Sequence, residues 1–167
     1  MVYDGMGRIS RKDLRQLQNE RLTTTVQDVY KSVSFYQQQL DEADIDPSAI
    51  TSGADLEQVP FTTKEDLRQQ YPDGLLAVPN KDIRRIHASS GTTGKPKIVG
   101  YTEQDLTIWA DFAARTLSIA GINPGDTVQN ATGYGLFTGG LGWHYAIEHL
   151  GATVVPSGAG NTARQIQ

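Results

Sequence analysis

Nine consecutive residues, 89–97, carry the side chains in this chain that are best suited to chemistry. They read Ser-Ser-Gly-Thr-Thr-Gly-Lys-Pro-Lys, so four hydroxyl groups, two glycines and a lysine lie within the first seven positions. Glycine permits positive φ and lets a ligand approach the main chain closely. Successive backbone N–H groups can then surround an anion, and a lysine ammonium supplies a mobile positive charge for a phosphate. The stretch therefore predicts a loop that binds a polyphosphate.

The predicted phosphate ligands are Ser89, Ser90, Gly91, Thr92, Thr93, Gly94 and Lys95. The loop is not a Walker A motif, because its glycines are three residues apart and Pro96 follows the lysine. Alternating β-branched residues at 83–87 and extended residues at 98–101 predict a strand on each side of the loop. The alternative is a plain surface turn, but such a turn needs neither the lysine nor four hydroxyl groups.

A second candidate site is the glycine-rich stretch 133–142, which reads Gly-Tyr-Gly-Leu-Phe-Thr-Gly-Gly-Leu-Gly. Glycine is unfavourable inside regular structure because it loses the most backbone freedom on folding, so this density predicts a loop. Tyr134 and Phe137 are its bulky aromatic residues, and pockets for small aromatic acids have flat apolar walls. From the residues alone, however, a structural interpretation is better than a pocket: Phe137 would lie in the core and Tyr134 on the surface.

The remaining candidates for chemistry carry less weight. His144 and His149 are five residues apart and do not share a helical face, so the histidines give no metal-ligand pattern. His87 lies just before the phosphate loop and is interpreted as structural, with orientation of the loop as its alternative role. Arg84 and Arg85 could clamp a phosphate, but a solvated pair is the better interpretation, and no catalytic residue is assigned.

Helix signals before the phosphate loop come from caps and periodicity. Ser10 and Asp13 have capping-box spacing ahead of one long amphipathic helix, whose region ends near residues 46–47. Thr62 and Glu65 have the same spacing and predict a short helix that runs to about Tyr71.

After the phosphate loop, the pattern alternates between strands and helices. Thr102 and Asp105 predict the start of a helix, and Gly121 is the expected C′ residue just beyond its end. Its expected buried stripe is Leu106, Trp109, Phe112, Ala113, Leu117 and Ala120. A strand at 127–131, a helix at 141–150 and a strand at 152–155 follow. This alternation predicts an α/β fold with a largely parallel sheet and flanking helices.

Composition excludes several classes of protein. The chain has 167 residues, which suffices for one domain with a real core, and a formal net charge of −4, which disfavours binding to nucleic acid. It contains no cysteine, so disulfides and thiolate metal sites are excluded. It contains no apolar run long enough for a transmembrane helix. We expect a soluble, cytoplasmic protein without a nucleic-acid or membrane partner.

The residues 89–96, Ser-Ser-Gly-Thr-Thr-Gly-Lys-Pro, resemble the phosphate loop of the adenylate-forming enzymes, which include acyl-CoA synthetases, peptide-synthetase adenylation domains and luciferases. Residues 56–71, 85–101 and 133–142 narrow the resemblance to phenylacetate–CoA ligases, and it runs in order over essentially the whole chain. It implies a partial adenylate-forming fold, with an N-terminal helical segment at 1–80 and the first part of an AMP-binding α/β subdomain at 81–167. Because these ligases are well over twice as long, we expect an N-terminal fragment.

The resemblance also implies a function, namely ATP-dependent ligation of an aryl acid such as phenylacetate to coenzyme A in aromatic acid catabolism. The cofactors would be ATP, Mg²⁺ and coenzyme A, with residues 89–95 on the β- and γ-phosphates and Tyr134, Phe137 and Gly139 lining the acid pocket. The family usually has tyrosine where this chain has Thr132, and the smaller residue leaves room for a larger acid such as indoleacetate. The catalytic lysine would belong to the C-terminal remainder, so we expect the 167 residues alone to be inactive.

Assembly and two other functions stay open. A partial sheet has a bare edge that can pair with another chain, so we expect self-association into a homo-oligomer. The chain could instead be a nucleotide- or anion-binding module that works at this length and binds ATP measurably. It could also be a non-catalytic interaction domain, whose stability would not change with ATP and Mg²⁺.

Overall fold

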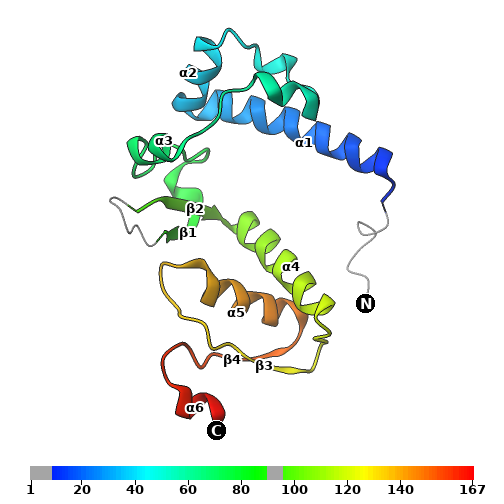
Figure 1. The fold of residues 1–167 in the computed structure, drawn as a ribbon, viewed down its shortest axis with the longest axis vertical. Coiled ribbons are helices and arrows are strands. Elements are labelled where there is room, and N and C mark those ends of the chain that lie inside the picture. Colours follow the sequence, from blue (N-terminus) through cyan, green and yellow to red (C-terminus); the bar gives the residue numbers. More distant parts are fainter. Residues whose placement is uncertain (1–8, 90–95) are drawn as a thin grey trace. The chain divides into compact units, whose positions relative to one another are not determined.

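The computed structural model describes residues 9–89 and 96–167. The chain forms two compact units, one up to Pro79 and the other from Asn80 to Gln167 (Figure 1). The candidate site residues that the structure describes all belong to the second unit. Within the described ranges, no helix is both long enough and apolar enough to cross a membrane.

The first unit is helical. Its elements are α1 (Arg11–Ser32), α2 (Ser34–Glu42), the 3-10 helices η2 (Pro47–Ala49) and η3 (Gly53–Gln58), and α3 (Lys64–Gln69). Ser10 caps α1 as predicted, because its Oγ accepts a hydrogen bond from the backbone N–H of Asp13 at 3.1 Å. The predicted single long helix is interrupted at Val33, whose extended backbone separates α1 from α2. Val26, Leu40 and Ile50 form a small core.

The cap of α3 lies one residue later than predicted. Thr63, not Thr62, is the N-cap residue, and Asp66 instead of Glu65 completes the capping box. The Asp66 carboxylate accepts the backbone N–H of Thr63 at 2.7 Å and its hydroxyl at 2.7 Å. Both pairs have the same spacing in the sequence Thr-Thr-Lys-Glu-Asp, so spacing alone could not choose between them.

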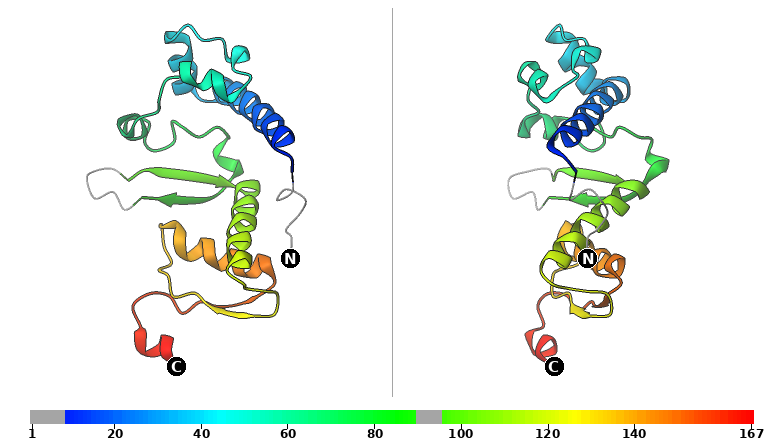
Figure 2. Two further views of the ribbon diagram at one scale, coloured as in Figure 1. Left: turned by 45° about the vertical axis from the view of Figure 1, so that its right-hand side comes forward. Right: turned by 90° about the vertical axis from the view of Figure 1, so that its right-hand side faces the viewer.

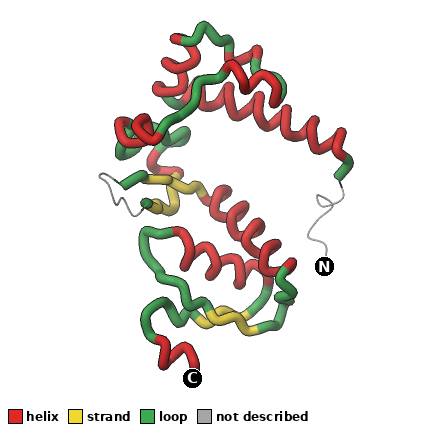
Figure 3. The backbone as a smooth tube through the Cα atoms, viewed as in Figure 1, coloured by secondary structure: helices red, strands yellow, loops and turns green. Residues whose placement is uncertain are grey.

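The second unit contains the strands. Its elements are η4 (Asn80–Asp82), β1 (Ile83–Ala88), β2 (Ile98–Thr102), α4 (Glu103–Ile119), β3 (Thr127–Gln129), α5 (Thr138–Leu150), β4 (Thr153–Val155) and α6 (Thr162–Ile166). Figure 2 shows them in two further views, and Figure 3 distinguishes helices, strands and loops by colour. The strands predicted on both sides of the phosphate loop are β1 and β2. The cap of α4 is also as predicted, with Thr102 and Asp105 in a capping box.

The parallel pairing predicted for the sheet holds for one pair of strands in the described part of the chain. β3 and β4 are parallel, from Thr127 opposite Thr153 to Gln129 opposite Val155, and α5 forms the crossover between them. β1 and β2 instead form a separate antiparallel pair. The residues between β1 and β2 are too few for the crossover that parallel strands require, so this pair is the antiparallel part of a fold that was predicted to be largely parallel.

The helices α4 and α5 pack against each other and differ from prediction in two ways. The buried residues of α4 are Ala110 and Ala114, whereas Phe112 of the predicted stripe is 61% exposed. The helix α5 begins at Thr138, three residues before the predicted start, so it includes Gly139, Gly140 and Gly142, of which the first two were predicted to precede the helix. A Cβ on one of them, Gly142, would lie 2.6 Å from the ring of Trp109. The glycine is there because the two helices approach closely, not because the backbone needs unusual dihedrals.

Candidate functional site

The strands β1 and β2 bring the two ends of the predicted phosphate loop together. The backbone N–H of Ser89 donates to the carbonyl oxygen of Lys97 at 3.0 Å, and the N–H of Lys97 donates to Ser89 Oγ at 3.1 Å. Ser89, alone of the seven predicted ligands, is a described residue, and its hydroxyl is engaged at the base of the loop. The six others lie outside the described residues: Ser90, Gly91, Thr92, Thr93, Gly94 and Lys95.

His87, two residues before Ser89, is buried and reaches the glycine-rich stretch. Its Nδ1 lies 2.9 Å from the carbonyl oxygen of Leu136, and the backbone N–H of Ala88 donates to the same oxygen at 3.0 Å. A carbonyl oxygen only accepts, so the hydrogen-bond network assigns a proton to Nδ1. The other ring nitrogen, Nε2, is buried and has no hydrogen-bond partner within the described part of the chain. The side chain of His87 therefore has a structural role, in agreement with the interpretation from the sequence. It connects the strand before the predicted phosphate loop to the glycine-rich stretch 133–142.

Two aromatic rings enclose the His87 imidazole. The ring of Tyr101, on β2, meets it edge to face with centroids 5.6 Å apart. The ring of Trp109, on α4, does the same at 5.4 Å and stacks on Tyr101 at 5.2 Å. Because Trp109 also fills the space beside Gly142 of α5, these contacts connect the end of β1 to both helices.

Asn130 organises the segment 132–137 and was missed by sequence reasoning. It lies directly after β3 and is only 4% exposed. Its Nδ2 donates to Tyr134 Oη and to the carbonyl oxygen of Gly140, both at 2.8 Å. Its Oδ1 accepts the hydroxyl of Thr132 at 2.6 Å and the backbone N–H of that residue at 3.2 Å. The signal in the sequence was a polar amide at the end of a predicted strand, which is too common to single out.

The three residues predicted for the acid pocket lie in different surroundings. Tyr134 is 39% exposed, and its hydroxyl lies 3.2 Å from Nδ1 of His144 in addition to its bond with Asn130. Phe137 is the N-cap residue of α5, and its side chain is 63% exposed. Gly139 lies in the first turn of α5, where an added Cβ would meet open space. The rings of Tyr134 and Phe137 are thus accessible to solvent, and Gly139 borders a groove between α4 and α5.

The groove beside Gly139 has a volume of about 370 Å³ and runs between α4 and α5. Its lining is mostly apolar and consists of Trp109, Phe112, Ala113, Thr116, Thr138, Gly139, Gly142 and Trp143. Neither Tyr134 nor Phe137 lines it.

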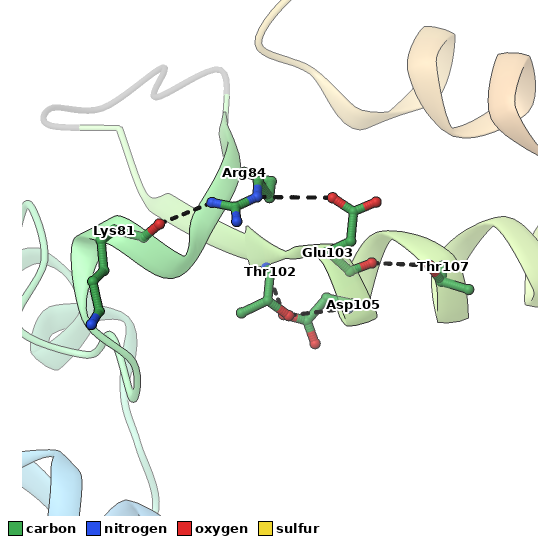
Figure 4. Close-up of polar contacts among 6 residues, drawn as sticks. All are labelled: Lys81, Arg84, Thr102, Glu103, Asp105 and Thr107. Atoms are coloured by element: carbon green, nitrogen blue, oxygen red, sulfur yellow. Dashed lines mark hydrogen bonds and ion pairs between the residues drawn. The ribbon is translucent and has the colours of Figure 1, made fainter.

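The neighbouring arginines Arg84 and Arg85 do not form a pair. Successive side chains of a strand point to opposite faces. Arg84 donates to the carbonyl oxygen of Lys81 at 2.9 Å and lies 3.9 Å from the carboxylate of Glu103, as Figure 4 shows together with the α4 cap. Arg85 instead lies over the ring of Tyr145, with its guanidinium carbon 4.5 Å from the ring centroid. The two side chains therefore do not converge on one ligand. In residues 9–89 and 96–167, no three His, Asp or Glu side chains gather into a metal site.

Curated relatives of the chain are phenylacetate–coenzyme A ligases. The enzyme of Thermus thermophilus is 54% identical over 158 residues, which are 95% of this chain and 36% of the relative. Those of Pseudomonas putida and Escherichia coli are 48% and 49% identical over 99% and 93% of this chain. The chain thus spans little more than a third of the length of these relatives. No protein-family model matches it.

Solved structures give the same relationship at the level of the fold. A 2-hydroxyisobutyryl-CoA ligase bound to 2-HIB-AMP and CoA, in an open conformation, matches 95% of this chain and 38% of its own, with 32% identity and a TM-score of 0.86. The same ligase in the thioesterification state matches with 33% identity and a TM-score of 0.87. These likenesses confirm the resemblance to phenylacetate–CoA ligases and the partial adenylate-forming fold that the motifs predicted.

Proposed function

We propose, from this kinship with phenylacetate–coenzyme A ligases, that the chain forms part of an ATP-dependent aryl-acid–CoA ligase. The observation that carries the proposal is sequence identity: about half of the aligned residues are identical to those of the ligases, and the alignments cover 93–99% of the chain. The motif at 89–96 supports it, because a loop of hydroxyl, glycine and lysine residues suits a nucleotide polyphosphate. We place the proposed enzyme in the cytoplasm, as a homo-oligomer that acts in aromatic acid catabolism.

The proposed reaction has two steps. An oxygen of the substrate carboxylate attacks the α-phosphorus of ATP, and the bond to pyrophosphate breaks, which gives an acyl adenylate. The sulfur of coenzyme A, after loss of its proton, then attacks the acyl carbon, and AMP leaves with the bonding electrons. The product is the acyl-CoA thioester. Mg²⁺ would accompany the nucleotide and offset the charge of its phosphates.

The role proposed for residues 89–95 is to hold the β- and γ-phosphates. Fixed donors that neutralise charge on the departing pyrophosphate lower the barrier to its release, and a positioned phosphate keeps the α-phosphorus in line for attack. The antiparallel pairing of β1 with β2 supports this role, because it fixes both ends of the loop at the Ser89–Lys97 contact. The lysine most suited to the phosphates is Lys95, since it belongs to the predicted loop, whereas Lys97 pairs with Ser89 at the base of that loop.

The role proposed for Tyr134, Phe137 and Gly139 is to surround the acid. The exposure of the Phe137 ring supports a contact with substrate, because an aromatic face in solvent can stack on an aryl group. Thr132 is smaller than the tyrosine usual in the family and leaves room in the proposed pocket, so the proposed acid is phenylacetate or a larger one such as indoleacetate. The hydroxyl of Thr132 is turned toward Asn130 in the structure, which favours this open arrangement.

Acid-dependent exchange of labelled pyrophosphate into ATP tests the proposal, with the intact protein that carries this sequence and a panel of aryl acids. We expect exchange with phenylacetate or indoleacetate and a loss of about 10²-fold in Lys95→Ala. Lys97→Ala is the matched control, because it removes the same charge two residues away, and we expect it to retain most of the activity.

The outcomes separate the alternatives. Exchange with phenylacetate supports the named activity, whereas exchange with only a bulkier acid keeps the chemistry and changes the substrate. The absence of exchange with every acid would overturn the proposal. ATP binding without exchange would then favour a nucleotide-binding module, and stability indifferent to ATP and Mg²⁺ would favour an interaction domain.

A further inference from the structure

We infer that His87 is a positioning residue that holds the acid-binding segment 132–137 in register with the phosphate loop. The inference rests on the proposed function of those two loops, and it concerns the contact between them. His87 lies two residues before Ser89, and its partner Leu136 directly precedes Phe137. One buried side chain therefore reaches from the start of one motif to the centre of the other.

The contact has the geometry of a specific hydrogen bond. His87 Nδ1 lies 2.9 Å from the Leu136 carbonyl oxygen, and the N–H of Ala88 reaches the same oxygen at 3.0 Å. Leu136 thus receives two donors from the end of β1, although 49 residues separate it from His87. The side chain of Leu136 is largely exposed, so apolar packing does not hold this residue against β1. The hydrogen bonds to its backbone carbonyl oxygen do.

Packing alone does not explain a histidine at this position. The ring is 2% exposed and lies against Tyr101 and Trp109, where an apolar ring would fill the same space. A buried polar atom without a partner costs free energy, and Nε2 has no partner among the residues described. An imidazole therefore costs more free energy to bury here than an apolar ring would. In return it provides one interaction that an apolar ring cannot make, the hydrogen bond from Nδ1–H to the Leu136 carbonyl oxygen.

The consequence is a coupling between the two sites. ATP bound at residues 89–95 would act on the end of β1, and through His87 on the carbonyl group that precedes Phe137. Coupling of binding is reciprocal, so the acid would equally favour ATP. Loss of the Nδ1 donor should therefore weaken acid binding in the presence of ATP more than it lowers the rate at saturation.

Two amide variants separate the donor from the ring. His87→Asn places an N–H donor near the position of Nδ1, whereas His87→Gln places it near Nε2, and both remove the aromatic ring. In the intact protein, we expect His87→Gln to raise the KM for the acid about tenfold in pyrophosphate exchange, with a smaller change in kcat. We expect His87→Asn to stay within about threefold of wild type, because it restores the donor.

A second measurement does not depend on activity. Hydrogen–deuterium exchange of the peptide that covers 130–140 should be faster in His87→Gln than in His87→Asn, which should resemble wild type. Equal exchange in the two variants, or equal KM values, would overturn the inference. If wild type shows no pyrophosphate exchange with any acid, the proposed function fails instead, and the deuterium comparison still decides whether His87 holds Leu136.

Discussion

The ring of Trp109 occupies the space in which a side chain on Gly142 would begin. A Cβ built on Gly142 would lie 2.6 Å from Cζ2 of the indole and 3.1 Å from its Nε1. These residues belong to α4 and α5, so the bare backbone of one helix receives the aromatic ring of the other. The same indole meets the imidazole of His87, and the contact with Gly142 therefore supports the end of β1 as well.

Gly142→Ala should destabilise the second unit. The added methyl group must displace the Trp109 ring, and overpacking of this kind costs about 1–3 kcal/mol. Gly139→Ala is the matched control in the same helix, because its Cβ would meet no atom within 4 Å. We expect that variant to be neutral or more stable by up to about 1 kcal/mol. Urea unfolding measures both, and a Gly142→Ala protein as stable as Gly139→Ala would contradict the packing described.

Asn130→Asp should destabilise the segment 132–137. The carboxylate cannot donate to the buried Gly140 carbonyl oxygen and leaves that acceptor unpaired at a cost of about 1–3 kcal/mol, whereas the Tyr134 hydroxyl can turn and donate to the carboxylate. Tyr134→Phe removes one of these partners and leaves the bond to Gly140, so we expect a loss below about 1 kcal/mol. Denaturant unfolding compares the two variants. A larger loss in Tyr134→Phe would show that the phenol, not the amide, holds this segment.

Thr63→Ala should cost about 0.5–2 kcal/mol, because Thr63 Oγ1 accepts the backbone N–H of Asp66 at the start of α3. Thr62→Ala is the control that distinguishes the two possible caps. Thr62 makes one long hydrogen bond, 3.3 Å to the hydroxyl of Tyr36, so we expect a change within about 0.5 kcal/mol. Hydrogen exchange of the α3 amides provides the measurement, and equal effects of the two substitutions would argue against Thr63 as the cap.

The capping carboxylate of Asp66 should also make stability depend on pH. Hydrogen bonds from the Thr63 hydroxyl and backbone N–H hold the pKa of Asp66 below its ordinary value of 3.8. The folded state therefore binds the proton more weakly than the unfolded chain. The stabilisation is complete above the ordinary pKa and is lost as pH falls through the lower pKa of the folded state.

Urea unfolding from about pH 5 to about pH 2 would reveal this loss. Asp66→Asn keeps an acceptor oxygen but does not titrate, so the free energy of unfolding of wild type should fall more steeply with acid than that of the variant. Asp55, whose pKa is likewise lowered by the backbone N–H groups of Thr51 and Ser52, leaves a residual dependence in both proteins. Parallel curves for wild type and Asp66→Asn would exclude a contribution from Asp66.

Local signals in the sequence determined the features that depend on neighbouring residues. The caps at Ser10 and Thr102 and the strands around residues 89–97 were all predicted, because side-chain caps and β-branched alternation act within a few residues. The ordered motifs also identified the family relationship. Where two local signals competed, at Thr62 and Thr63, the sequence could not decide between them.

Tertiary structure decided what distant residues share. Gly140 looks like a loop residue by propensity, yet it lies in α5, and the glycines at 140 and 142 are needed there because neighbouring backbone and the Trp109 ring leave no room for side chains. The direction of β1 against β2 follows from the short connection between them, and α5 supplies the crossover that makes β3 and β4 parallel. The bond from His87 to Leu136 spans 49 residues, and no periodicity records a contact between positions that only folding brings together.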